Sequence, residues 1–198
     1  LASAQYGIRT YAGGGPDNLP ATSANVGAPY GVAVDAAGNI YASAYLRHQV
    51  FKITPGGTIT VFAGNGQYGF YGDGGAAKNA ALSYPQGIAL DSAGNLYIAD
   101  TSNFRVRIVS GGTITTFAGS ADGFAGDGGP AREATLSGPK GIAVAPDGSV
   151  YLADTENHAI RVIDRKVKIL VVEGAPRWEF KYLQRAFLRD RRVDVSFV

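Results

Sequence analysis

Two kinds of acidic turn recur along the chain and have the composition of a binding surface. One reads Gly-Asp-Gly-Gly, at residues 72–75 and 126–129, and the other reads Ala-Asp-Thr-x-Asn, at residues 99–103 and 153–157. Carboxylates gathered on one surface beside aromatic rings could bind a cation, a basic peptide or a sugar. The candidate ligand-binding side chains are Asp73, Asp100, Asp127, Asp154, Tyr71 and Phe124.

The same side chains have a structural alternative. Asp and Asn accept hydrogen bonds from backbone N–H groups two residues further on, and they stabilise turns in this way. The aspartates recur where the surrounding sequence recurs, which is typical of residues that the fold itself requires. We therefore favour a turn-stabilising role for the aspartates and a gap-filling role for the aromatic rings.

Other chemistries find little support among the residues. His48 and His158 occupy equivalent positions and could contribute to a zinc site, but the middle copy has Phe104 there, which favours a packing role. Residues 64–69 have the spacing of a dinucleotide fingerprint, yet the glycine-rich stretch that follows cannot form the helix that binds the phosphates. The chain has no Gly-x-Ser-x-Gly nucleophile elbow. We predict no catalytic residue, no metal and no cofactor.

The turns belong to a longer repeat, which must position them. A Pro-x-Gly segment with alternating small and branched residues opens each copy, with spacings of 56 and 54 residues, at 29–34, 85–90 and 139–144. Each copy continues with a turn, a second strand that carries a Tyr near its start, and a third strand. Fourth strands follow at 58–63 and 113–118, and an earlier copy of this strand lies at 8–12. The third copy has no fourth strand of this type.

Four short strands, each bounded by Gly, Asn or Asp, are typical of a propeller blade. Small residues suit the innermost strand, because the blades crowd together at the axis. A closed propeller needs at least four blades. The sequence therefore predicts an all-β fold, an open arc of about three four-stranded blades over residues 7–164. In such blades the long acidic loops emerge on one face, and only tight turns such as Gly38-Asn39 emerge on the other.

The repeats resemble NHL repeats of the bacterial, teneurin-like kind, on the evidence of both acidic turns and of three concordant copies of the repeat. The resemblance implies a β-propeller, usually of six blades. The first copy departs from the pattern, since Ala44 and Arg47 replace the Asp and Asn, so its turn is expected to be built differently. Some similar propellers are metal-dependent lactonases or lyases, but the innermost strands here offer only Gly, Ala, Val, Ile and Leu near the axis.

Residues 165–198 have a different composition. They carry a net charge of +5 and only Gly174 of the 28 glycines. Strands at 167–172 and 193–198 around a helix at 177–189 form a predicted βαβ fragment. Residues 169–183 resemble the start of a glutamine-amidotransferase-like domain; the catalytic Cys of that family has no counterpart in this chain, so no such activity is implied.

Composition limits the functional classes. The net charge of +2 gives no general attraction to nucleic acid, and no apolar run is long enough to span a membrane. Residues 1–6 have a small-x-small pattern that fits a signal-peptide remnant, so we expect an extracellular or periplasmic protein. We predict a non-enzymatic scaffold that binds a protein or carbohydrate ligand on the long-loop face. The alternatives are a metal-dependent, lactonase- or lyase-like propeller enzyme, and a sensor or surface module of a larger bacterial protein, whose partners are missing blades or neighbouring domains.

Overall fold

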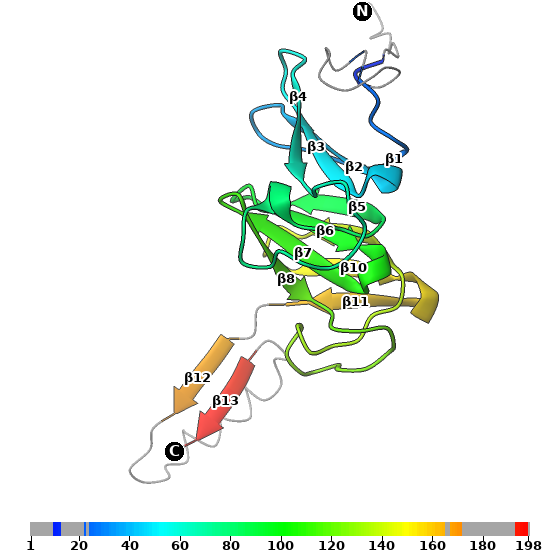
Figure 1. Cartoon of the computed structure of the whole chain (residues 1–198). Coiled ribbons are helices and arrows are strands. Elements are labelled where there is room, and N and C mark those ends of the chain that lie inside the picture. The colour runs from blue at the N-terminus through cyan, green and yellow to red at the C-terminus, as the bar shows by residue number, and fades with distance from the viewer. Residues whose placement is uncertain (1–9, 13–21, 23, 165–166, 172–192, 198) are drawn as a thin grey trace, which may run out of the picture.

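The computed structural model describes residues 10–12, 22, 24–164, 167–171 and 193–197 (Figure 1). Three antiparallel sheets follow one another along the chain and correspond to the three predicted blades. Blade 1 contains β1 (Pro29–Val34), β2 (Ile40–Ala44), β3 (Gln49–Ile53) and β4 (Ile59–Ala63). Blade 2 contains β5 (Pro85–Leu90), β6 (Leu96–Asp100), β7 (Arg105–Ser110) and β8 (Thr113–Ala118). Blade 3 contains β9 (Pro139–Val144), β10 (Val150–Asp154) and β11 (Ala159–Ile163).

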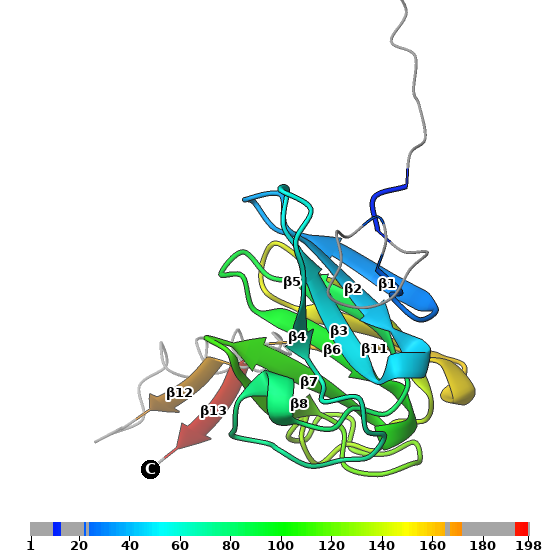
Figure 2. The ribbon, with the colours of Figure 1, turned by 45° about the horizontal axis from the view of Figure 1, so that its top comes forward.

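The blades pack through their innermost strands, with β5 in contact with β1 on one side and β9 on the other. Figures 1 and 2 show the three sheets fanned around this line of inner strands. The sheets do not close into a ring, which confirms the predicted open arc. Over the described residues the sheet of blade 3 has three strands, so β11 forms its outer edge.

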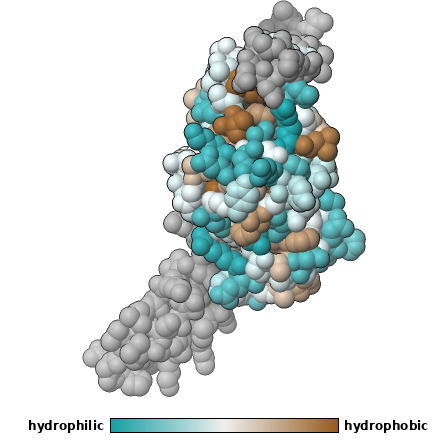
Figure 3. Space-filling view, in the orientation of Figure 1, coloured by the Kyte–Doolittle hydropathy of each residue, from teal (hydrophilic) through white to brown (hydrophobic). Residues whose placement is uncertain are grey.

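The core lies between successive blades. Tyr41 of blade 1 packs edge-on against Phe62, and Tyr97 of blade 2 packs in the same way against Phe117, each with ring centroids 4.9 Å apart. Both tyrosines are buried, whereas Tyr151, the equivalent residue of blade 3, is 45% exposed. The difference follows from the sheet of blade 3, which has three strands in the described part of the chain and no fourth strand there to supply an aromatic partner. On the face seen in Figure 3, hydrophobic side chains form small separate patches.

Tight turns join the first two strands of each blade as the sequence predicts. Asp35 accepts hydrogen bonds from the backbone N–H groups of Ala37 and Asn39 at 3.0 and 2.8 Å, and Asp91 does the same in blade 2. Gly38 has a φ of +79°, which a glycine adopts without a steric penalty.

Short 3₁₀ helices join the second and third strands on the opposite face. They are η2 (Tyr45–Arg47), η4 (Thr101–Asn103) and η5 (Thr155–Asn157), and a further one, η3 (Ala77–Asn79), lies in the loop between blades 1 and 2. All three turns form a 3₁₀ helix that ends in a residue of left-handed conformation, which is His48 in blade 1. The backbone hydrogen bonds of the blade 1 turn differ as expected, because Tyr45 donates to the carbonyl of Ala28, whereas Ser102, the residue after the position equivalent to Tyr45, donates to Ser83 in blade 2.

Beyond the blades, β12 (Val167–Val171) and β13 (Val193–Phe197) form a parallel pair, in register from Val167 opposite Val193 to Val171 opposite Phe197. This agrees with the two strands of the predicted βαβ fragment. The helix predicted at 177–189 and the segment 1–6 lie outside the described residues. No helix in the described part of the chain is long and apolar enough to cross a membrane.

Candidate functional site

Asp100 and Asp73 of the sequence prediction meet at one buried arginine in blade 2. Arg107, on β7, has no exposed side-chain surface and bonds Asp73 at 2.5 Å and Asp100 at 3.4 Å. Asp100 also accepts a hydrogen bond of 2.6 Å from the backbone N–H of Ser83 and one of 2.8 Å from the side chain of Asn103. These bonds tie the loop before β5 to the turn after β6.

The two carboxyl groups have opposite pKa shifts. Burial raises the pKa of Asp100 to about 6, although the bonds from Asn103, Ser83 and Arg107 act in the other direction. Partial burial also raises the pKa of Asp73, but hydrogen bonds from Thr116 and the charge of Arg107 outweigh it and hold that pKa below its usual value. The difference follows from exposure, because Asp73 lies at the surface of the cluster and Asp100 at its centre.

Blade 3 repeats this arrangement with Asp127 and Asp154. Arg161 bonds Asp127 at 2.6 Å and Asp154 at 3.3 Å, and Asp154 accepts a bond of 2.7 Å from the N–H of Ser137. The four predicted aspartates therefore form two equivalent clusters, one in blade 2 and one in blade 3. Their bonds join separate segments of the chain, whereas the predicted bond to the N–H two residues further on is made by Asp35 and Asp91. Ligand binding by the four carboxylates stays a prediction.

Tyr71 makes contacts within its own loop, and Phe124 contacts a residue of β11. The hydroxyl of Tyr71 donates a hydrogen bond to Gln67 and accepts one from Asn65. Phe124 is exposed, and its ring lies 5.1 Å from the guanidinium of Arg161. Both rings are exposed, so these contacts do not show the gap-filling role, and ligand binding by the two rings stays a prediction.

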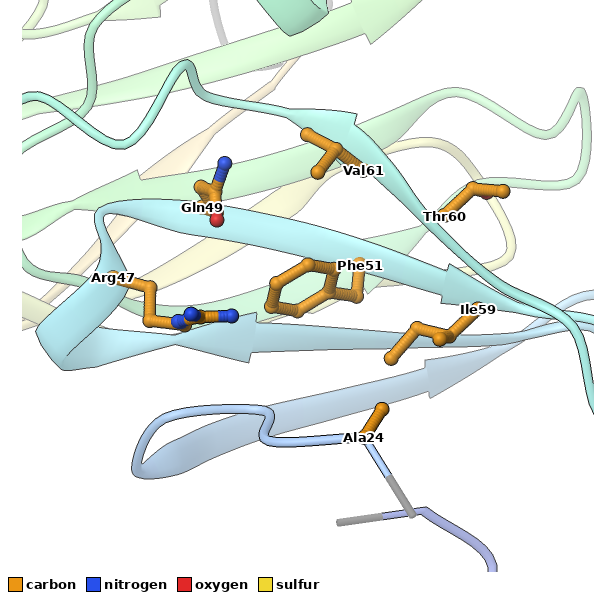
Figure 4. A pocket seen from close by; sticks show the side chains of 7 residues that line it. All are labelled: Ala24, Arg47, Gln49, Phe51, Ile59, Thr60 and Val61. Atoms are coloured by element: carbon orange, nitrogen blue, oxygen red, sulfur yellow. The ribbon is translucent and has the colours of Figure 1, made fainter. Parts of the chain in front are cut away.

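Blade 1 has apolar residues where the other blades have the ionic cluster. Ala44 and Phe51 take the places of the Asp and the Arg, and both are buried together with Val26. A cavity of about 190 Å³ lies beside Phe51, with Ile59 and Val61 on its wall and Arg47 and Gln49 at one end (Figure 4). The ionic cluster is therefore not a requirement of every blade.

A second surface, which the sequence prediction missed, lies at the junction of blades 1 and 2. Five aromatic rings follow one another there, and we call them the aromatic strip: Tyr30, Tyr45, Tyr84, His48 and Tyr68. Successive ring centroids are 6.0, 4.8, 4.6 and 6.1 Å apart. Tyr30 and Tyr68 are well exposed, so the strip is open to solvent at both ends.

The aromatic strip departs from the repeat, unlike the aspartates. Tyr45 stands where the other blades have Thr101 and Thr155, and Tyr84 stands where they have a small residue, Ala28 or Gly138. Tyr84 has a φ of +50°, a conformation that is costly for a bulky side chain. Ala28 and Gly138 have the same left-handed conformation, so the fold sets the backbone here, and the large side chain is what distinguishes Tyr84 from its equivalents. Strained residues of this kind cluster at functional sites.

Two polar groups accompany the strip on the inner strands. Gln86, two residues after Tyr84, is only 5% exposed, and its Oε1 atom accepts no hydrogen bond from the described residues. Lys140 donates a bond of 2.9 Å to Glu156, which raises the pKa of its ammonium group; the phenols of Tyr30 and Tyr45 raise it further. A buried polar atom without a partner is costly unless a ligand satisfies it.

His48 makes the strip sensitive to pH. Its Nδ1 atom accepts a bond of 3.2 Å from the N–H of Tyr84, which requires an unprotonated nitrogen, and burial lowers the pKa of His48 below 6.5. The bond therefore contributes above pH 6.5 and is lost as the pH falls through the lowered pKa. We expect the Tyr84 amide signal in NMR to shift together with the His48 ring between pH 7.5 and 5. In His48→Phe, which copies Phe104 of blade 2, this shift should disappear; a shift that persists would assign the titration to another group.

The described residues contain no group of three or more His, Cys, Asp or Glu side chains that could hold a metal ion. The aromatic strip offers aromatic rings and the nearby ammonium group of Lys140, and the exposed carboxylate of Asp127 adds to the chemistry of the loop face.

The four-strand unit, its two full copies and the packing through inner strands define a β-propeller built from repeats. Residues 66–125 and 122–179 match the Teneurin NHL domain family, and together they span more than half of the chain. The protein belongs to this family.

Relatives agree with this assignment. NHL repeat-containing protein 2 of Homo sapiens is 33% identical over 122 residues, which are 60% of this chain and 17% of the relative. Teneurin-1 of Homo sapiens is 34% identical over 104 residues, 45% of this chain and 4% of the relative. The chain thus matches a small part of these much longer proteins. A solved protein of unknown function from Bacteroides thetaiotaomicron is similar, with 29% identity, a TM-score of 0.60, and 68% of this chain and 34% of that chain covered.

Proposed function

We propose that this protein is an interaction module that binds a carbohydrate or protein ligand on its loop face, through the aromatic strip. The observation that carries the proposal is Tyr84, a strained tyrosine at a position where the other blades have Ala28 and Gly138. Exposed aromatic rings such as those of Tyr30 and Tyr68 stack on sugar rings or on apolar side chains. Export to the periplasm or the cell exterior, and a place beside further domains of a bacterial protein, belong to the same proposal.

A metal-dependent propeller enzyme, the alternative from the sequence, is less well supported. It needs ligands that converge on one point, and the described residues offer no such group. The geometry favours binding over metal-assisted catalysis.

The test is a screen of the purified chain against a glycan microarray and a phage-displayed peptide library. Variants that copy the other blades, Tyr84→Gly and Tyr45→Thr, should weaken binding of the selected glycan or peptide up to about tenfold, as loss of a stacked ring costs on the order of 0.5–1.5 kcal/mol. Their melting temperatures should change little, because glycine relieves the strain at position 84 and threonine is accommodated at the equivalent positions.

Tyr151→Ala is the matched control, since Tyr151 is an exposed tyrosine on blade 3 outside the strip. It should bind like the unmodified chain. Ligands that bind all three variants equally would show that the aromatic strip is not the binding surface.

A further inference from the structure

Blade 3 carries an open groove along its outer edge. The groove has a volume of about 790 Å³ and lies between β11 and the Gly-Asp-Gly-Gly loop, with Asp127, Leu136, Ile160 and Val162 on its walls. Ile160 is 74% exposed and Val162 53% exposed, which is unusual for branched apolar side chains of a sheet. The edge of β11 makes no pairing with a fourth strand in the described residues. An unpaired edge of this kind is a template for a further strand.

Blade 2 shows what fills this space. There β8 lies between β7 and the equivalent loop, and Ile114 exchanges backbone hydrogen bonds of 2.8 and 3.0 Å with Gly74 and Gly75. The N–H and hydroxyl of Thr116 both donate to Asp73, at 3.0 and 2.6 Å. The groove of blade 3 therefore has the form of a site for an extended strand with a buried apolar residue and, two positions later, a hydroxyl group.

The exposed fractions of Asp73 and Asp127 show how much of the ionic cluster a fourth strand covers. Asp73, covered by β8, is 36% exposed, whereas Asp127 is 76% exposed. Arg161 is likewise more exposed than Arg107, at 11% against 0%. Among the residues that the structure describes, none supplies to Asp127 the hydroxyl donor that Thr116 supplies to Asp73.

The chain itself contains a strand of the required type. Residues 8–12 read Ile-Arg-Thr-Tyr-Ala and align with Ile114–Ala118, which read Ile-Thr-Thr-Phe-Ala. Thr10 falls on Thr116 and Ile8 on the fully buried Ile114. The segment therefore has the sequence of a fourth strand.

A threonine at the position of Thr116 on the fourth strand occurs in the blade that has the ionic cluster and not in the blade that lacks it. In blade 2 Thr116 lies beside Arg107, whereas in blade 1 Val61 occupies the position of Thr116 and Phe51 that of Arg107. Blade 3 has Arg161 at the position of Arg107, so we expect its fourth strand to carry a hydroxyl group at the position of Thr116. The residue 54 positions after Thr116 is Leu170 of β12, which has no hydroxyl group. The strand β12 pairs with β13 and not with β11.

Residues 8–12 of the same molecule cannot reach the groove. Ala12 packs against the blade 1 cluster of Val26, Ala44 and Phe51, and blade 2 separates blades 1 and 3. Sheets packed face to face lie about 10 Å apart, so two steps span about 20 Å. Residues 8–11 extend over at most about 14 Å.

We propose that the groove of blade 3 binds residues 8–12 of a second copy of this chain as an antiparallel fourth strand, with Thr10 donating to Asp127. The groove and the strand are different surfaces of the molecule, so the contact is head-to-tail, and it forms either a closed ring of copies or an open series. This inference rests on the repeat and is independent of the proposed ligand surface.

The experiment measures self-association of the full 198-residue chain by light scattering and analytical ultracentrifugation over a range of concentrations. We expect association, and a synthetic peptide of residues 7–13 should reverse it. Thr10→Val and Asp127→Asn should each weaken association about tenfold. Thr60→Val, which changes an exposed threonine on the existing fourth strand of blade 1, is the matched control and should have no effect.

A cross-linking measurement separates loss of contact from loss of folding. The chain has no cysteine, so Thr10→Cys and Asp127→Cys chains, mixed and oxidised, should form a heterodimer. Thr10→Cys mixed with Lys78→Cys, an exposed site on the equivalent loop of blade 2, should not. A chain that stays monomeric at all concentrations and gives no cross-link overturns the proposal. This holds whether residues 167–171 pair with the edge of β11 in solution or the edge stays unpaired.

Discussion

Replacement of Arg107 by alanine is expected to lower the free energy of unfolding by about 3–5 kcal/mol, as measured by urea denaturation. The guanidinium has no exposed surface and lies between Asp73 and Asp100. Without it, the buried carboxylate of Asp100 keeps only the bonds from Ser83 and Asn103, and a buried charge that loses its counter-ion is strongly unfavourable. Arg161→Ala in blade 3 removes the equivalent arginine and should lower the free energy of unfolding by less, since its partner Asp127 is largely exposed.

Blade 1 provides a control for this prediction. It accommodates Ala44 and Phe51 at the positions of Asp100 and Arg107, and both are buried in an apolar cluster. The double variant Asp100→Ala/Arg107→Phe should therefore lose clearly less stability than the sum of the two single variants. It should not be neutral, because the N–H of Ser83 loses its acceptor, whereas in blade 1 the equivalent N–H of Gly27 bonds to Asn25. Additive losses would show that the arginine and the aspartate act independently.

The sequence predicts the aspartates but not their arginine partners, for a reason that lies in the repeat. An Asp in a turn has an obvious local role, whereas Arg107 is on the next strand and looks like a surface residue of a β-strand. The signal was present, however: Ala44 and Phe51 change together where the other blades keep Asp and Arg. Comparison of the copies with one another, and not only with a family pattern, would have found the pair.

The aromatic strip was harder to predict, because its members come from three distant segments that only the junction of two blades brings together. Spacing along the chain carries no signal for such a surface. What distinguishes Tyr45 and Tyr84 is that they depart from the repeat, while the fold itself was predictable from the positions that keep to it. In a repeat protein, residues that recur with the strands explain the architecture, and residues that break the pattern are the better candidates for function.

Gly87→Ala is expected to destabilise the protein by at least about 3 kcal/mol, again measured by urea denaturation, which is the upper end for overpacking. A Cβ atom at Gly87 would lie 2.1 Å from the carbonyl oxygen of Lys140 and 3.1 Å from the nitrogen of Ile142, both backbone atoms of β9. Backbone atoms of a paired strand cannot move aside individually. Blades 2 and 3 would have to separate along the axis, which would loosen the core cluster that holds Tyr97 against Leu152.

Gly141 is the matched control for Gly87, because it occupies the same Pro-x-Gly position one blade further on. A Cβ atom there would meet only the Cβ of Ala153, at 3.3 Å, since no blade follows β9 in the described structure. Gly141→Ala should therefore change the stability of the monomer by less than about 1 kcal/mol. Equal losses in the two variants would contradict packing through the inner strands.

The same substitution also reports on the open end of the arc. If the binding of residues 8–12 in the groove brings blade 1 of a second copy against β9, a methyl group at position 141 would clash with the backbone of that copy. The clash would resemble the one expected within a single chain between a methyl group at position 87 and β9. Gly141→Ala would then be harmless in dilute solution and would weaken the assembly at concentrations where the chain associates. A crowded axis is thus expected wherever two blades meet, whether or not the chain is continuous between them.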